Sequence, residues 1–91
     1  MNYILAPQPP IITKLAFRFR LTDQEYVDIL SAAKTDVEVQ AWLETFNMVT
    51  RIDLSDSRTK LGLNKLVEKE ILTEQRVNAI LNEEISPEER F

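Results

Sequence analysis

Hydrophobic side chains recur at helical spacing through most of the chain after Leu21. The first stripe has apolar residues at i, i+3, i+4 and i+7, which place them on one face of a helix. It consists of Tyr26, Ile29, Leu30 and Ala33. Thr22 and Glu25 precede this stripe at the spacing of a capping box, in which each side chain bonds a backbone amide of the first turn. The sequence therefore predicts a helix capped by Thr22.

Three further helices are predicted from the same kind of signal. One has Thr35 as its N-cap with Glu38 three residues on, one begins near Ser55–Ser57, and one begins at Thr73. Their apolar stripes are Val39, Trp42, Leu43 and Phe46; Leu61, Leu63, Leu66, Val67 and Ile71; and Val77, Ile80 and Leu81. The pattern predicts a mainly α fold, a small bundle of about four helices over residues 22–91.

The first 21 residues have a different pattern. Three prolines before Ile11 exclude a helix and favour an extended path. From Ile11 to Leu21, apolar side chains alternate with basic ones, which predicts an amphipathic strand. Thr50–Leu54 is the one other strand candidate, and its backbone could pair with this strand. We therefore divide the chain into an extended basic arm, residues 1–21, and a helical domain, residues 22–91.

Charge is unevenly distributed between these parts. The chain has a net charge of −4, but residues 1–20 carry three basic side chains and no acidic one, so the remainder carries −7. A body of that charge repels phosphate backbones, which makes nucleic-acid binding by the helices unfavourable. The basic arm is expected to meet an acidic protein surface.

Catalytic and cofactor chemistry has little support in the composition. The chain contains no histidine and no cysteine, and therefore lacks the usual general base and the usual metal ligands. Asp53–Ser57 has oxygen ligands but lacks the glycine and terminal glutamate of a calcium loop, so we interpret it as a helix cap. With one glycine, no phosphate-binding loop can form. We predict a non-enzymatic protein without metal or cofactor, and no stretch has the roughly 18 apolar residues of a membrane span.

Two further patterns are given structural interpretations. Trp42 and Phe46, at i and i+4, are expected to belong to the core and not to a ligand cage. The segment Glu70–Arg76 joins two helices by a tight turn, as in a DNA-binding helix-turn-helix. Its second helix offers only Arg76 as a cation against three glutamates, so that role is disfavoured.

Four phrases together resemble small open reading frames in the tail-gene region of tailed bacteriophages. They are FRFRLTDQEYVDIL, DVEVQAWLETFNM, IDLSDSRTKLGLNKLV and ILTEQRVNAIL, and they extend from about Phe17 to Leu81. The resemblance implies a phage-encoded protein that is a minor virion component of the tail or connector, and a location in the virion or the host cytoplasm. It assigns no binding or catalytic residue.

The leading hypothesis is a structural or adaptor subunit of a multi-copy assembly that docks on other protein subunits through its N-terminal arm. The expected partner-binding residues are Tyr3, Ile4, Leu5, Ile11, Ile12, Lys14, Phe17, Arg18, Phe19 and Arg20. The arrangement also allows a homo-oligomer. Two alternatives stay open: a soluble regulator or assembly chaperone that uses an acidic helical face, and a nucleic-acid-binding regulator.

Overall fold

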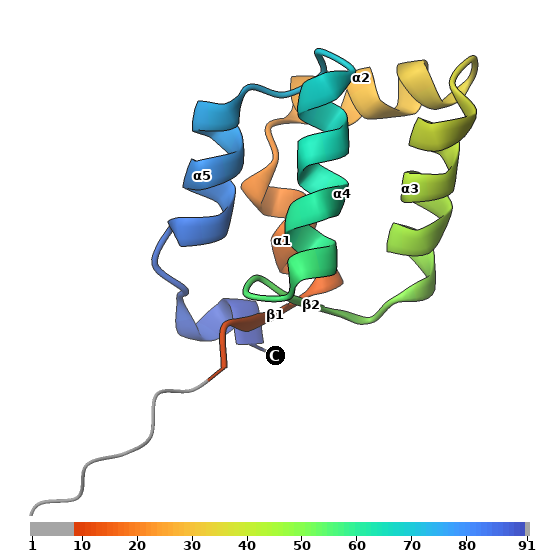
Figure 1. Cartoon of the computed structure of the whole chain (residues 1–91). Helices are drawn as coiled ribbons and strands as arrows, with labels where there is room; N and C mark the ends of the chain where they lie inside the picture. The colour runs from red at the N-terminus through yellow and green to blue at the C-terminus, as the bar shows by residue number, and fades with distance from the viewer. Residues whose placement is uncertain (1–8, 91) are drawn as a thin grey trace, which may run out of the picture.

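The computed structural model describes residues 9–90, which form one small helical bundle with a two-stranded sheet at one end (Figure 1). In chain order the elements are β1 (Ile11–Thr13), α1 (Lys14–Arg20), α2 (Asp23–Ala33), α3 (Val37–Met48), β2 (Arg51–Asp53), α4 (Ser57–Glu68), α5 (Glu74–Asn82) and the 3-10 helix η1 (Pro87–Arg90). The prediction of a mainly α bundle with an N-terminal strand is confirmed. Within residues 9–90, no helix has the length and apolar composition to cross a membrane.

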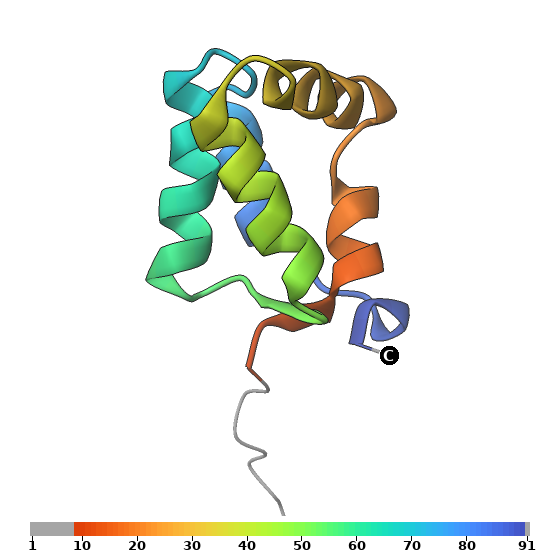
Figure 2. The same ribbon diagram turned by 90° about the vertical axis from the view of Figure 1, so that its right-hand side faces the viewer.

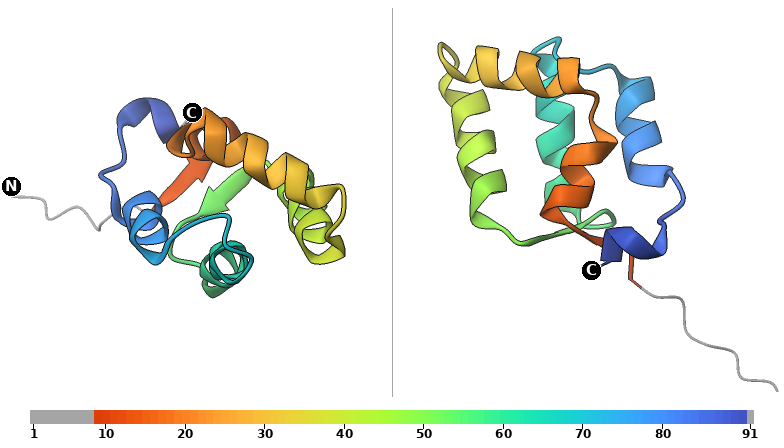
Figure 3. Two further views of the ribbon diagram at one scale, coloured as in Figure 1. Left: turned by 90° about the horizontal axis from the view of Figure 1, so that it is seen from above. Right: turned by 180° about the vertical axis from the view of Figure 1, so that it is seen from behind.

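The helices pack around one core, and further elements cover both ends of the bundle. α3, α4 and α5 stand side by side with α4 in the middle, and α1 lies behind them (Figures 1 and 3). α2 crosses one end of this group, whereas the sheet and η1 lie at the other end (Figure 2). The two strands are antiparallel, with Ile12 opposite Ile52. The segment Thr50–Leu54, the candidate partner of the N-terminal strand, therefore supplies the strand β2 that pairs with β1.

The predicted length of the N-terminal strand is wrong. Only Ile11–Thr13 is a strand, and the chain continues directly into α1. Thr13 caps this helix, because its hydroxyl oxygen accepts a hydrogen bond from the backbone N–H of Ala16 at 3.0 Å. β2 offers only three residues for pairing. A helix satisfies its own backbone groups, whereas a longer strand would leave them without partners.

Helix starts follow the predicted caps with one exception. Thr22 and Glu25 form the complete capping box of α2, and Thr73 caps α5. The helix predicted to begin near Ser55–Ser57 is α4, and it starts inside that window with Asp56 as its cap. The cap of α3 is Asp36 and not Thr35 as predicted, because the Asp36 carboxylate accepts from the N–H of Glu38 at 3.0 Å.

One hydrophobic core joins the N-terminal segment to the later helices. Ile12, Phe17 and Leu21 are buried in the same cluster as side chains from α2, α3, α4 and α5. The core therefore includes residues from both sides of the boundary predicted at residue 21. Leu61, which was expected to face inward, is 67% exposed on α4.

Candidate functional site

The residues expected to bind a partner do not share one surface of the protein. Tyr3, Ile4 and Leu5 lie outside the described residues. Phe19 is exposed on α1, and Ile11 is half-buried in β1.

Lys14 and Arg18 are held by neighbouring parts of the fold. The ammonium group of Lys14 donates to the backbone oxygen of Asn47 at 3.2 Å. The guanidinium of Arg18 lies 4.0 Å from the centre of the Tyr26 ring. Such a cation on an aromatic face contributes about 0.5–1 kcal/mol at an exposed site.

Ile12, Phe17 and Arg20 face the interior of their own chain, which corrects the expectation that their side chains reach a neighbour. Ile12 lies in β1 opposite Ile52, whereas the inward direction of Phe17 and Arg20 results from the helix over Lys14–Arg20. In the predicted strand Leu15, Phe17 and Phe19 would share one face, but in the helix Phe17 points inward while Leu15 and Phe19 stay exposed. These three buried side chains stabilise the fold.

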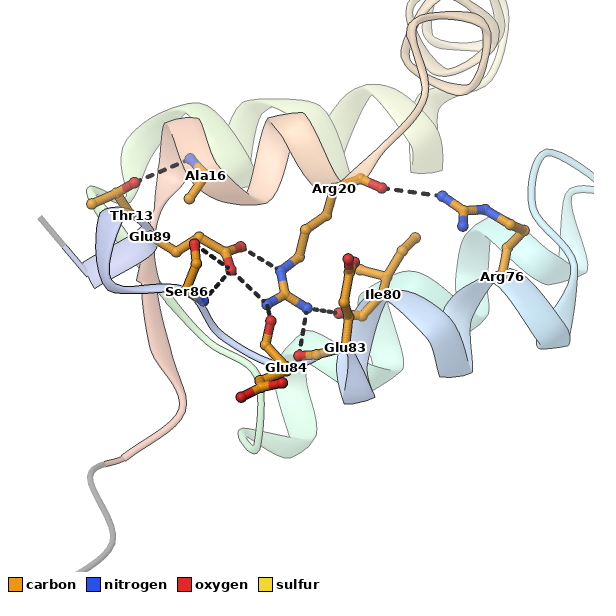
Figure 4. Close-up of polar contacts among 9 residues, drawn as sticks. All are labelled: Thr13, Ala16, Arg20, Arg76, Ile80, Glu83, Glu84, Ser86 and Glu89. Carbon is orange, nitrogen blue, oxygen red and sulfur yellow. Dashed lines mark hydrogen bonds and ion pairs between the residues drawn. The ribbon is translucent and has the colours of Figure 1, made fainter.

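Arg20 is a buried cation held by the C-terminal part of the chain (Figure 4). Its Nε donates to Oε2 of Glu89 at 2.7 Å and its Nη2 donates to Oε1 at 3.0 Å. Nη1 donates to the backbone oxygens of Ile80 at 2.8 Å and Glu83 at 3.1 Å, and Nη2 reaches that of Glu84 at 3.4 Å. The carbonyls at the end of a helix carry partial negative charge, so this site suits a cation. The hydrogen bonds from Arg20 lower the pKa of Glu89 below its usual 4.5.

A second ion pair ties α2 to α5. Arg76 donates from Nε to Oε2 of Glu25 at 2.8 Å and from Nη2 to Oε1 at 2.9 Å. Nη2 also donates to the backbone oxygen of Arg20 at 3.1 Å. Hydrogen bonding to Arg76 lowers the pKa of Glu25. The cation of the suspected recognition helix is therefore engaged inside the fold.

An apolar groove of about 600 Å³ lies between α3 and α4, and we call it the α3–α4 groove. Its volume lies in the range of roughly 300–1,000 Å³ found for binding sites. Trp42 and Phe46 lie parallel there, with ring centres 5.5 Å apart and an angle of 4° between the planes. Phe46 is buried as predicted for a core residue, whereas Trp42 is half-buried and lines the groove. Leu61 lines the groove from α4.

The single glycine of the chain brings Trp42 close to α4. A Cβ atom placed on Gly62 would lie 2.8 Å from the indole nitrogen of Trp42 and 3.0 Å from its Cδ1. The first distance is shorter than real Cβ contacts, so the indole position requires glycine at this point of the helix. Gly62 therefore determines the width of the groove at Trp42.

Charged side chains surround the groove and pair with one another. Lys65 on α4 lies 2.8 Å from the Glu38 carboxylate on α3. Arg58 lies 2.8 Å from Asp56, and its hydrogen bonds lower the pKa of Asp56 to about 2. These pairs neutralise the rim, so the groove attracts neither an anion nor a cation strongly.

A second hollow of about 650 Å³ lies on the other side of α4. Its lining is polar and includes Asn78, Asn82 and Glu83 from the end of α5, together with Lys60. Pro10 lines it as well, so the N-terminal segment enters the described structure at this hollow.

The described part of the chain contains no cluster of side chains that could hold a metal ion. Over residues 9–90, no three acidic, histidine or cysteine side chains gather as metal ligands. Asp53 accepts from the N–H and hydroxyl of Ser55, and Asp56 caps α4. The capping interpretation of Asp53–Ser57 thus agrees with the observed contacts.

The α3–α4 groove was not found from the sequence, although two signals for it are visible there. Leu61 precedes Leu63 by two residues, so on a helix it does not lie on the inward face that Leu63 and Leu66 share. Gly62 is a glycine inside a helix, which destabilises the helix by about 1 kcal/mol relative to alanine and usually has a packing reason.

Comparison with protein-family models, with curated proteins and with solved structures finds no match to this chain.

Proposed function

We propose that this protein is a non-enzymatic structural or adaptor subunit of a multi-copy assembly, and that its α3–α4 groove binds an apolar segment of another protein chain. The observation that carries this proposal is the stacked pair of Trp42 and Phe46, which forms the floor of a groove with no occupant from residues 9–90. An apolar centre within a polar rim is the usual anatomy of a protein interface. Tryptophan is also among the residues that most often dominate binding energy there.

The chemistry of the rim supports a peptide segment over a charged substrate. Two of the acidic groups that line the groove have a cationic partner, Glu38 with Lys65 and Asp56 with Arg58. A charged substrate would have to displace such a partner, whereas an uncharged segment can cover the floor and leave the pairs in place.

The two alternatives differ in how well the groove supports them. A regulator or assembly chaperone would bind one protein through an acidic helical face, and the α3–α4 groove with its paired rim charges adds no support to that mode of binding. Nucleic-acid binding by the helices is opposed by the net charge of −7 after residue 20. A place in a phage virion rests on the resemblance to tail-gene reading frames alone, and it is part of the proposal on that basis.

A pair of leucine substitutions tests the proposed function. Leu61 in the groove is 67% exposed and Leu15 on α1 is 62% exposed, so Leu61→Glu and Leu15→Glu add the same charge at equally accessible helix positions. Each variant carries a C-terminal tag and is expressed in the source cells, and the size of its complexes is measured by sedimentation. We expect wild type and Leu15→Glu in a particle much larger than one chain, and Leu61→Glu at monomer size.

Two results would contradict the proposal. One is monomer-sized sedimentation of the wild-type chain. The other is incorporation of Leu61→Glu at the wild-type level. Identification of the particle by mass spectrometry then separates the classes, because a virion subunit is present in purified phage particles and a regulator is present only in the cell lysate. Circular dichroism of each variant confirms that the helices are retained.

A further inference from the structure

The start of the described chain is firmly fixed at Pro9 and Pro10. The backbone oxygen of Pro9 accepts from the N–H of Ile11 at 2.8 Å and from Nη1 of Arg90 at 2.8 Å. The backbone oxygen of Pro10 accepts from the N–H of Leu54 at 2.8 Å. Because these bonds come from β1, η1 and the end of β2, the fold determines where residues 1–8 leave the body.

This exit lies on the opposite side of α4 from the α3–α4 groove. Pro10 lines the polar hollow between α4 and α5, whereas Trp42 and Phe46 line the groove between α4 and α3. α4 stands between the two helices in Figure 1, and the view from behind in Figure 3 gives the same order. A segment that leaves at Pro9 would have to pass around α4 to enter the groove of its own chain.

Residues 1–8 have the composition of a groove ligand. The segment Met1–Gln8 contains no charged side chain, and Tyr3, Ile4 and Leu5 form an apolar run beside Pro7. Eight residues span at most about 29 Å when extended, which sets the greatest distance between Pro9 and the groove of an adjacent copy. Proline restricts the free chain, so such a segment loses less conformational entropy on binding.

We propose that Tyr3, Ile4 and Leu5 of one copy bind in the α3–α4 groove of a neighbouring copy. This inference rests on the proposed function and names the partner as a second copy of the chain. The charges agree with it, because the segment has no charged side chain and Glu38 and Lys65 at the rim are paired with each other. Covering the groove with this segment therefore leaves Glu38 and Lys65 paired with each other.

The inferred contact is head-to-tail. The chain exit at Pro9 and the acceptor groove lie on opposite sides of α4, which favours a heterologous contact that repeats from copy to copy over a reciprocal exchange between two copies. Such contacts build a closed ring or an open filament, which agrees with a subunit of a multi-copy assembly.

A mixing experiment with two variants tests this arrangement. In the donor variant, Ile4→Asp and Leu5→Asp disable the donor segment and leave the groove intact. In the acceptor variant, Leu61→Glu disables the acceptor groove and leaves the segment intact. The measurement is molecular mass by light scattering over a range of concentrations. We expect wild type to form oligomers, each variant alone to stay monomeric, and the mixture to form a one-to-one dimer that cannot extend. Leu15→Glu serves as the control and should oligomerise like wild type.

Tryptophan fluorescence reports directly on the groove, because Trp42 is the single tryptophan of the chain. A labelled peptide of residues 1–10 is added to the donor variant, whose groove is empty of its own segment. We expect the Trp42 emission to move to shorter wavelength as the peptide saturates the groove. The same peptide should leave the emission of Leu61→Glu unchanged.

Several outcomes would overturn the inference, and they differ from failure of the proposed function. If the donor variant still oligomerises while Leu61→Glu does not, the groove binds another segment, and the inference fails while the function stands. If wild type stays monomeric but the donor substitutions shift the Trp42 emission to longer wavelength, the segment binds in its own chain. If Leu15→Glu alone abolishes association, the interface is the exposed face of α1. If no variant changes mass or emission, the inference and the function both fail.

Discussion

The side chains of Arg20 and Glu89 are joined by two hydrogen bonds although they lie 69 residues apart, with 2.7 Å between Nε and Oε2 and 3.0 Å between Nη2 and Oε1. The pair connects the end of α1 to η1 (Figure 4). The side chain of Arg20 is 3% exposed and that of Glu89 is 18% exposed. This contact therefore fixes the C-terminal segment against the N-terminal helix.

Substitution of Arg20 should destabilise the protein strongly. Arg20→Met fills the space but leaves the Glu89 carboxylate and the carbonyls at the end of α5 without their cation. Removal of one partner from a buried pair costs about 3 kcal/mol or more in free energy of unfolding. The measurement is urea unfolding followed by circular dichroism. Arg18→Met is the matched control, with an expected loss of about 1 kcal/mol or less, because its partner Asp23 is 96% exposed. Equal losses for the two variants would contradict this ranking.

The two arginine-bound glutamates predict how stability depends on pH. In the folded chain the pKa values of Glu25 and Glu89 lie below the usual value of 4.5, which each residue has in the unfolded chain. At a pH between the folded and the unfolded pKa, the unfolded chain therefore binds more protons than the folded chain. Their contribution to stability is complete above pH 4.5 and is lost as the pH falls through the folded pKa values. Melting temperature measured against pH should therefore fall on the acid side of this value.

Charge removal at Glu89 should flatten that acid slope. Glu89→Gln has no carboxylate to protonate, so its melting temperature should be lower than that of wild type at neutral pH and should converge with it in acid. Glu88→Gln removes the same charge from an exposed neighbour and controls for net charge. An acid slope in Glu89→Gln as steep as in wild type would show that the Arg20 pair does not contribute to it.

The strand β1 should be essential for stability. Ile12 is fully buried and belongs to the main core cluster. Ile12→Ala should lower the free energy of unfolding by about 3 kcal/mol, within the usual 2–5 kcal/mol for such a truncation. Ile11→Ala changes the half-buried neighbour, whose side chain points to the other face of the strand, and should cost less. Equal stability of Ile12→Ala and wild type in urea would mean that the arm does not contribute to the core.

The cap of α1 can be tested against a threonine that does not cap. Thr13→Ala removes the oxygen that accepts from the N–H of Ala16 and should cost about 1 kcal/mol. Thr35→Ala is the control, because Asp36 caps α3 and the side chain of Thr35 is exposed. Thermal unfolding of both variants gives the comparison, and a larger loss for Thr35→Ala would reverse the assignment of the caps.

Gly62→Ala should change the α3–α4 groove more than it changes stability. Alanine favours the helix by about 1 kcal/mol, but its methyl group would displace the Trp42 indole, so the two effects oppose each other. We expect an altered Trp42 emission spectrum and weaker self-association with a small change in melting temperature. Asn64→Ala, at an exposed position of α4, tests helix propensity without touching Trp42. Emission from Gly62→Ala identical to wild type would mean that the indole tolerates the methyl group.

Local signals predicted the body of the fold well. The capping box at Thr22, the cap at Thr73 and the window Ser55–Ser57 each gave a helix start that the structure contains. These signals succeed because a cap satisfies backbone amides only three or four residues away, so its energy depends on local sequence. The cap of α3 moved by one residue because Thr35 and Asp36 both can serve.

The sequence by itself determined a helical chain, its turns and a strand near the N-terminus, because these depend on spacing and on nearby hydrogen bonds, whereas it offered Thr50–Leu54 only as a candidate partner for that strand. Only the tertiary structure decided that Lys14–Arg20 is a helix and that Arg20 is buried. An alternation of apolar and basic residues fits both conformations, and the choice depends on distant groups: the short β2 offers few backbone partners, and Glu89 with the end of α5 supplies the charge that Arg20 needs. The α3–α4 groove was decided at the same level, because it depends on how closely Trp42 approaches Gly62 across two helices.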